Sequence, residues 1–154
     1  MINVRLILTF SILILISCKS RTNISKTPPY PIISLEKTTC LGTCPAYKFL
    51  VYPNGVVKYS GYKFVDRIGD YQAKINDEEI GKLKEAFENA HFFDFANVYS
   101  ANMTDLPTTY LYYDNGNQNS KVTDYFGAPK ELKSLESFVE AFIETIDWKK
   151  TDQL

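Results

Sequence analysis

The chain has 154 residues, 45% of them hydrophobic and 23% charged, which suits a single globular domain with its own core. Its 17 basic and 18 acidic residues give a net charge of −1 at pH 7. A protein that binds nucleic-acid backbones needs an excess of Lys and Arg, so this balance argues against a nucleic-acid partner. The 11 Tyr and 10 Phe favour a fold rich in β-sheet.

The chain starts with a short apolar segment that ends at a cysteine. Arg5 supplies a positive charge, and residues 6–16 are mostly apolar. A bilayer-spanning helix needs about 20 such residues, so this run is too short. With Ser17 before Cys18, the segment resembles a bacterial lipoprotein signal. The resemblance implies removal of residues 1–17, lipid on Cys18 and a membrane anchor outside the cytoplasm. The alternative is an uncleaved signal anchor or a cytosolic chain with an apolar start.

Residues 18–30 are polar and rich in basic side chains, which predicts a flexible tether before a single folded domain, 31–150. The basic side chains suit contact with anionic headgroups, and equally a solvated spacer. Lys19 follows Cys18 where an aspartate is associated with inner-membrane retention in enteric bacteria. The acidic run associated with surface export in Bacteroidota lipoproteins is also missing. By this analogy we expect the bacterial outer membrane, with the domain facing the periplasm.

Four strands are predicted in the first half of the domain. Residues 32–37 form the first, and residues 47–52 alternate as a half-buried strand does. Residues 53–55, Pro-Asn-Gly, predict a tight turn, because Asn and Gly tolerate positive φ. The chain then returns through residues 56–62, and residues 70–75 form a fourth strand.

A helix is predicted after these strands. Asn76 is its N-cap, and Glu79 stands three residues further on, the spacing of a capping box. Apolar residues then recur at helical spacing: Ile80, Leu83, Ala86, Phe87 and Ala90. Residues 91–107 are predicted to be irregular.

Two more strands and a second helix complete the predicted order. Residues 108–113 and 121–125 form strands joined by an Asp-Asn-Gly turn, and Pro129 opens the last helix. One side of that helix is apolar: Leu132, Leu135, Phe138, Val139, Phe142, Ile143 and Ile146. The order of four strands, helix, two strands, helix predicts an α+β fold. Its mostly antiparallel sheet would be covered on one face by two amphipathic helices.

Three motifs carry a family resemblance. They are Cys40-Leu41-Gly42-Thr43-Cys44-Pro45-Ala46-Tyr47, Tyr52-Pro53-Asn54-Gly55-Val56-Val57-Lys58-Tyr59 and Thr104-Asp105-Leu106-Pro107-Thr108-Thr109. From Cys40 to Trp148 the chain resembles domain-of-unknown-function family 6438, which is common in lipoproteins and secreted proteins of Bacteroidota. The family has no assigned activity, so the resemblance supports a domain boundary and implies no reaction.

The cysteine pair has three possible roles. If Cys18 carries lipid, Cys40 and Cys44 remain as a pair in an oxidising compartment. A structural disulfide between the first two strands would stabilise the fold by roughly 2 kcal/mol. A redox couple is the second possibility, although the two cysteines are separated by three residues and begin no long helix. Metal binding is the third, but His91 is the only histidine, and we expect no metal and no cofactor.

Two further groups are candidate binding residues. Asp105, with Thr104, suits a polar ligand in a loop, and equally the turn cap that such residues often form before a proline. Tyr110 and Tyr112 share one strand face. If helices cover only the opposite face, these tyrosines suit recognition of a sugar or peptide; cross-strand aromatic packing is the alternative.

The sequence therefore predicts a membrane-tethered envelope lipoprotein with a non-catalytic binding or interaction domain. Its ligand would be an unidentified protein, peptide or glycan. Without a second histidine or a nucleophile elbow, the sequence gives no support to a Ser-His-Asp enzyme. The alternative is a thiol–disulfide redox or redox-sensing protein that uses Cys40 and Cys44.

Overall fold

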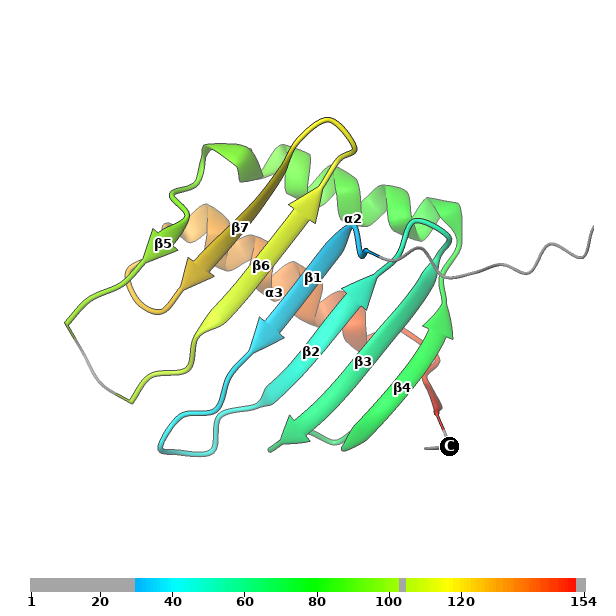
Figure 1. Ribbon diagram of the computed structural model, residues 1–154, viewed down its shortest axis with the longest axis horizontal. Coiled ribbons are helices and arrows are strands. Elements are labelled where there is room, and N and C mark those ends of the chain that lie inside the picture. Colours follow the sequence, from blue (N-terminus) through cyan, green and yellow to red (C-terminus); the bar gives the residue numbers. More distant parts are fainter. Residues whose placement is uncertain (1–29, 103–104, 152–154) are drawn as a thin grey trace, which may run out of the picture.

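The computed structural model describes residues 30–102 and 105–151, which form one twisted sheet with helices on one side (Figure 1). The order across the sheet is β5-β7-β6-β1-β2-β3-β4-β8, in which β5 (Val98–Tyr99) and β8 (Lys149–Lys150) are the two edge strands. The central strands are β1 (Ile33–Lys37), β2 (Ala46–Val51), β3 (Val56–Lys63), β4 (Gly69–Lys74), β6 (Thr109–Asp114) and β7 (Asn119–Asp124). Every neighbouring pair is antiparallel except β5 and β7, which are parallel.

Helices α2 (Asp77–Asn89) and α3 (Lys130–Glu144) both lie behind the sheet in Figure 1. The core fills the space between them and the strands. Its fully buried side chains include Ile33, Leu35, Phe49, Val51, Val57, Leu83, Phe87, Leu111, Leu132 and Val139. The opposite face of the sheet is left without a helix (Figure 1).

The α+β class and the mostly antiparallel sheet are confirmed, but the predicted order of elements is wrong in detail. Two-residue strands, β5 (Val98–Tyr99) and β8 (Lys149–Lys150), extend the sheet at its two edges. The segment 91–107, predicted to be irregular, contains β5 and the single turn η1 (Phe92–Asp94). Strands this short show no alternation in the sequence, because they depend on the neighbour they pair with.

The covering layer also contains more than the two predicted helices. Phe92 of η1 is buried in the core, with its ring 5.0 Å from that of Phe87. Trp148 packs edge-on against Phe49, with ring centroids 6.1 Å apart, and donates a hydrogen bond from Nε1 to the carbonyl of Ile143. The aromatic residues after each helix therefore extend the cover.

Helix α2 begins with the predicted capping box. The side chain of Asn76 accepts a hydrogen bond from the backbone N–H of Glu79, and the Glu79 carboxylate accepts one from the N–H of Asn76. Both bonds satisfy donors that have no partner inside a helix.

Helix α3 corrects one predicted core position. Pro129 is its N-cap, and Leu132, Val139 and Ile143 are buried as expected. Phe138, predicted on the same stripe, is 41% exposed. Each helical residue advances by about 100°, which carries Phe138 away from its neighbour Val139 and to the edge of the buried face.

The predicted signal peptide, the lipidated Cys18 and all of the tether before Tyr30 lie outside the described residues. Within 30–102 and 105–151, no helix is long and apolar enough to cross a bilayer.

Candidate functional site

The face of the sheet without helices contains a hollow of about 540 Å³, which we call the tyrosine groove. Its lining residues come from the start of the domain and from four neighbouring strands: Tyr30, Pro31, Ser34, Glu36, Lys48, Leu50, Tyr110, Tyr112, Asp114 and Lys121. Alternate residues of a strand point to the same face, so these side chains are the outward set of strands whose inward set forms the core.

Strand register brings the groove residues side by side. One row crosses four strands as Leu50, Ser34, Tyr112 and Lys121. The next row is Lys48, Glu36, Tyr110 and Thr123. The small Ser34 stands between the larger Leu50 and Tyr112, and this difference in size opens the hollow.

The groove combines aromatic rings with balanced charge. Glu36 and Lys48 form an ion pair at 3.1 Å. The Nζ atom of Lys121 lies 4.3 Å from the ring centroid of Tyr110, a cation–π contact. Burial raises the pKa of the Tyr112 hydroxyl, and the charge of Asp114 and a hydrogen bond to it raise the pKa further. Tyr112 is therefore a neutral hydrogen-bonding group at physiological pH.

The candidate binding residues of the sequence do not form one site. Tyr110 and Tyr112 lie together in the groove. Asp105 is exposed, has a φ of 75° and is not a lining residue of the groove, while Thr104 lies outside the described residues. Sequence reasoning missed Tyr30, Ser34 and the other lining residues, although the alternation in β1 indicates which of its side chains face outward.

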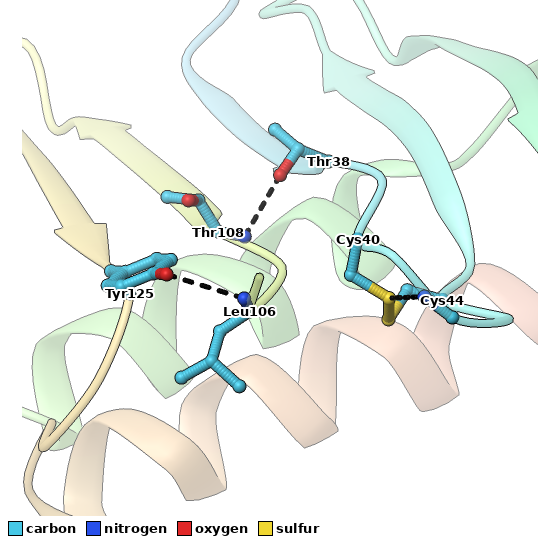
Figure 2. Close-up of a disulfide and its surroundings, with 7 residues drawn as sticks. Thr38, Cys40, Cys44, Leu106, Thr108 and Tyr125 are labelled. Atoms are coloured by element: carbon cyan, nitrogen blue, oxygen red, sulfur yellow. Dashed lines mark hydrogen bonds between the residues drawn. A yellow bond between two sulfur atoms is a disulfide. The ribbon is translucent and has the colours of Figure 1, made fainter. Parts of the chain in front are cut away.

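Cys40 and Cys44 are joined by a disulfide in the exposed connection between β1 and β2 (Figure 2). Their Cα atoms are 5.7 Å apart, and the backbone N–H of Gly42 donates to Cys40 Sγ at 3.2 Å. The bond closes a small loop directly after the chain leaves β1.

The segment before β6 is held beside the end of β1, close to the disulfide loop (Figure 2). The N–H of Thr108 donates to Thr38 Oγ1 at 2.9 Å, and the N–H of Thr38 donates to the carbonyl of Thr108 at 3.0 Å. The N–H of Leu106 donates to the Tyr125 hydroxyl at 3.3 Å. These contacts hold the segment beside β1 and Tyr125, through the backbone of Leu106 and Thr108.

A second hollow, of about 400 Å³, lies between α3 and the β3–β4 loop, and we call it the α3 pocket. Its lining residues are Lys37, Pro45, Tyr47, Tyr59, Phe64, Val65, Asp66, Arg67, Glu140, Ala141 and Glu144. Sequence reasoning missed it, because we interpreted α3 through its apolar residues alone. The spacing of four between Glu140 and Glu144 was the available signal.

Outside the α3 pocket, Asp124 of β7 and Glu136 of α3 both form ion pairs with Lys133 of α3. The side chains of Asp124 and Glu136 are 1% and 6% exposed. Lys133 Nζ contacts the Asp124 carboxylate and lies 3.2 Å from Glu136 Oε2. Burial raises the pKa of Glu136 to about 7, Lys133 opposes this rise, and Asp124 adds to it. Among residues 30–102 and 105–151, no three His, Cys, Asp or Glu residues are arranged to hold a metal.

The fold and the groove define an α+β domain whose uncovered sheet face is lined with tyrosines. Residues 31–143 match the family described as "Domain of unknown function (DUF6438)", and the chain belongs to this family. No curated protein matches the chain.

Proposed function

We propose that this protein is a lipid-anchored envelope protein whose domain binds a neutral glycan in the tyrosine groove and performs no reaction on it. The observation that supports the proposal is the groove itself: a hollow of about 540 Å³ with tyrosine walls, on the face that carries no helix. Ligand sites commonly have volumes of about 300–1,000 Å³ and combine aromatic surface with a few polar groups.

The charges of the groove favour a neutral ligand. Two carboxylates, Glu36 and Asp114, are balanced by two lysines, Lys48 and Lys121. A sugar ring places C–H groups against an aromatic face, while its hydroxyls exchange hydrogen bonds with groups of both charges. Tyr112 supplies such a surface beside these polar groups.

The position of the groove disfavours a peptide added as a strand. Strand addition needs a free sheet edge, because the peptide pairs with unused backbone groups. The groove lies over β1, β2, β6 and β7, and the first three of these have a hydrogen-bonded neighbour on both sides. The outer edge of β7 pairs with β5 at Thr123 and Asp124. A peptide lying over β1, β2 or β6 would therefore have to bind through side chains alone.

The lipid anchor rests on residues 1–18. The apolar run and Ser17-Cys18 support removal of the signal and acylation of Cys18. Tyr30 lines the groove only twelve residues after Cys18, so the proposed anchor would keep the groove close to the membrane. We propose that this is the outer membrane and that the groove faces the periplasm.

The ligand class is tested by isothermal titration of the purified full-length protein. The probes are neutral hexasaccharides of glucose, xylose and N-acetylglucosamine, and uncharged and charged peptides of similar size. The proposal expects saturable binding of at least one hexasaccharide. Saturable binding of peptides alone would contradict the glycan assignment.

A thiol–disulfide role has one supporting observation, the exposed position of the Cys40–Cys44 loop. Its test is the reduction potential of that bond, followed by alkylation and mass shift across glutathione buffers. A potential above about −200 mV would support a redox role, and one below about −300 mV would mark a structural bond.

A further inference from the structure

The α3 pocket exists because a hairpin loop folds back over the core face of the sheet. Gly61 of β3 stands opposite Tyr47, where the ladder between β2 and β3 shifts register. A Cβ atom at Gly61 would lie 1.8 Å from the carbonyl oxygen of Arg67. Only glycine therefore lets the loop approach this closely. The loop also contains Phe64 with a φ of 53°, which is unusual for an aromatic residue.

Two ion pairs join α3 to the sheet and the loop around this pocket. Lys37 Nζ lies 2.8 Å from Glu140 Oε1. Arg67 Nη1 donates to both carboxylate oxygens of Glu144, at 2.9 and 3.2 Å. The two basic side chains of the pocket, Lys37 and Arg67, are therefore each neutralised by a carboxylate of α3.

The pocket is lined by a largely buried tyrosine whose hydroxyl has no hydrogen-bond partner among the described residues. Tyr47 is only 7% exposed, and its ring stacks on that of Tyr59 with centroids 5.4 Å apart. Its hydroxyl makes no hydrogen bond within the described part of the chain, and the oxygen is not among the atoms fully sealed from solvent without a partner. It therefore reaches accessible space, and the space that Tyr47 lines is the α3 pocket. A hydroxyl that opens into the pocket in this way is available to a ligand.

The charge of the pocket is negative. Lys37 and Arg67 stand against Asp66, Glu140 and Glu144, which gives a net charge of −1. Burial raises the pKa of Tyr47 well above its usual range, and the negative charge of Glu140 is the next largest cause. Both the phenol and the carboxylates favour a positively charged occupant, since they accept hydrogen bonds.

We propose that the α3 pocket binds the primary ammonium group of a small organic amine. Such a group has three N–H donors. Three acceptors lining the pocket have no partner among the described residues: the Tyr47 hydroxyl, Glu140 Oε2 and the Asp66 carboxylate. One added positive charge also brings the lining to neutrality. This site is independent of the tyrosine groove, which lies on the other face of the sheet.

The probe is 1,5-diaminopentane, and its neutral analogue 1,5-pentanediol is the matched control. Protein-observed NMR titration of the full-length chain at low salt is expected to give saturable shifts with the diamine, with a dissociation constant of about 1 mM or lower. Added salt weakens this binding, because charge contributes to it. Equal binding of the diol, or no saturation by the diamine, would overturn the proposal.

Tyr47→Phe removes the hydroxyl and keeps the ring. It is expected to weaken diamine binding about tenfold, because the hydrogen bond involves a charged donor. Tyr71→Phe is the matched control, since Tyr71 packs against Tyr59 on the same sheet face and does not line the pocket. Asp66→Asn, at an exposed position, also weakens binding. If Tyr47→Phe and Asp66→Asn both bind as the unmodified protein does, the diamine occupies another place and the assignment is wrong.

Discussion

The buried carboxyl group of Glu136 makes the stability of this fold depend on pH. Burial raises the pKa of Glu136 from its ordinary value of 4.5 to about 7. Between these two values the folded state binds a proton that the unfolded state has lost. The free energy of unfolding therefore falls as pH rises through this window.

The size of the effect follows from the two pKa values. Between about pH 5.5 and about pH 8.5, ionisation of Glu136 lowers the free energy of unfolding by about 2 kcal/mol. For a denaturant slope of about 2 kcal/mol/M, the urea midpoint falls by about 1 M. Glu136→Gln carries no titrating proton, so it should remove most of this dependence.

Urea unfolding, followed by circular dichroism at several pH values, measures how the urea midpoint changes with pH. The matched control is Glu131→Gln, an exposed position on the same helix, which should keep the pH dependence of the unmodified protein. A urea midpoint that stays constant or rises between the two pH values would refute the reasoning. The reasoning would also be refuted if the urea midpoint of Glu136→Gln depended on pH as strongly as that of the unmodified protein.

Three further predictions concern other parts of the chain. Replacing Cys40 and Cys44 together by alanine should lower the free energy of unfolding, measured by urea titration, by about 2 kcal/mol, because a five-residue loop is no longer closed. An unchanged free energy of unfolding would mean that the disulfide does not constrain the unfolded chain. Cys18→Ala should abolish metabolic labelling with an alkyne analogue of palmitate and release the protein from the membrane fraction; continued labelling would contradict acylation of this cysteine. Gly61→Ala should destabilise the fold by about 1–3 kcal/mol because of its close backbone contact. Gly81→Ala, in open space on α2, should instead stabilise it by about 0.5–1 kcal/mol, and thermal melts that rank the two variants in the opposite order would contradict this.

The sequence predicted those elements whose signals are local. The period of two in Tyr47, Phe49 and Val51 predicts a strand with these side chains on one face, and the structure buries all three. Asn76 and Glu79 mark the start of α2, because a capping box involves neighbouring residues alone. The edge strands β5 and β8 have no such local signal, since pairing with a distant strand creates them.

The candidate sites were less predictable because they depend on long-range register. The sequence placed Tyr110 and Tyr112 on one strand face, but their neighbours Ser34 and Leu50 come from strands far away along the chain. In the sequence, Gly61 resembles any glycine within a strand. The structure shows that it is needed for the close approach of the Arg67 carbonyl. The α3 pocket follows from that contact, which no periodicity in the sequence describes.

The central claim is that a glycan binds in the tyrosine groove, and one comparison of variants tests it most directly. Tyr112→Ala removes a wall of the groove. Tyr62→Ala changes a 56% exposed tyrosine of β3 that does not line it. The measurement is the affinity of both full-length variants for the hexasaccharide that binds the unmodified protein most tightly.

The account predicts that Tyr112→Ala loses at least about tenfold in affinity, since stacking and burial on one ring contribute about 1–3 kcal/mol. Tyr62→Ala should bind as the unmodified protein does, and both variants should unfold at the normal urea concentration. Equal affinity of the two variants, or no hexasaccharide bound by the unmodified protein, would contradict the account.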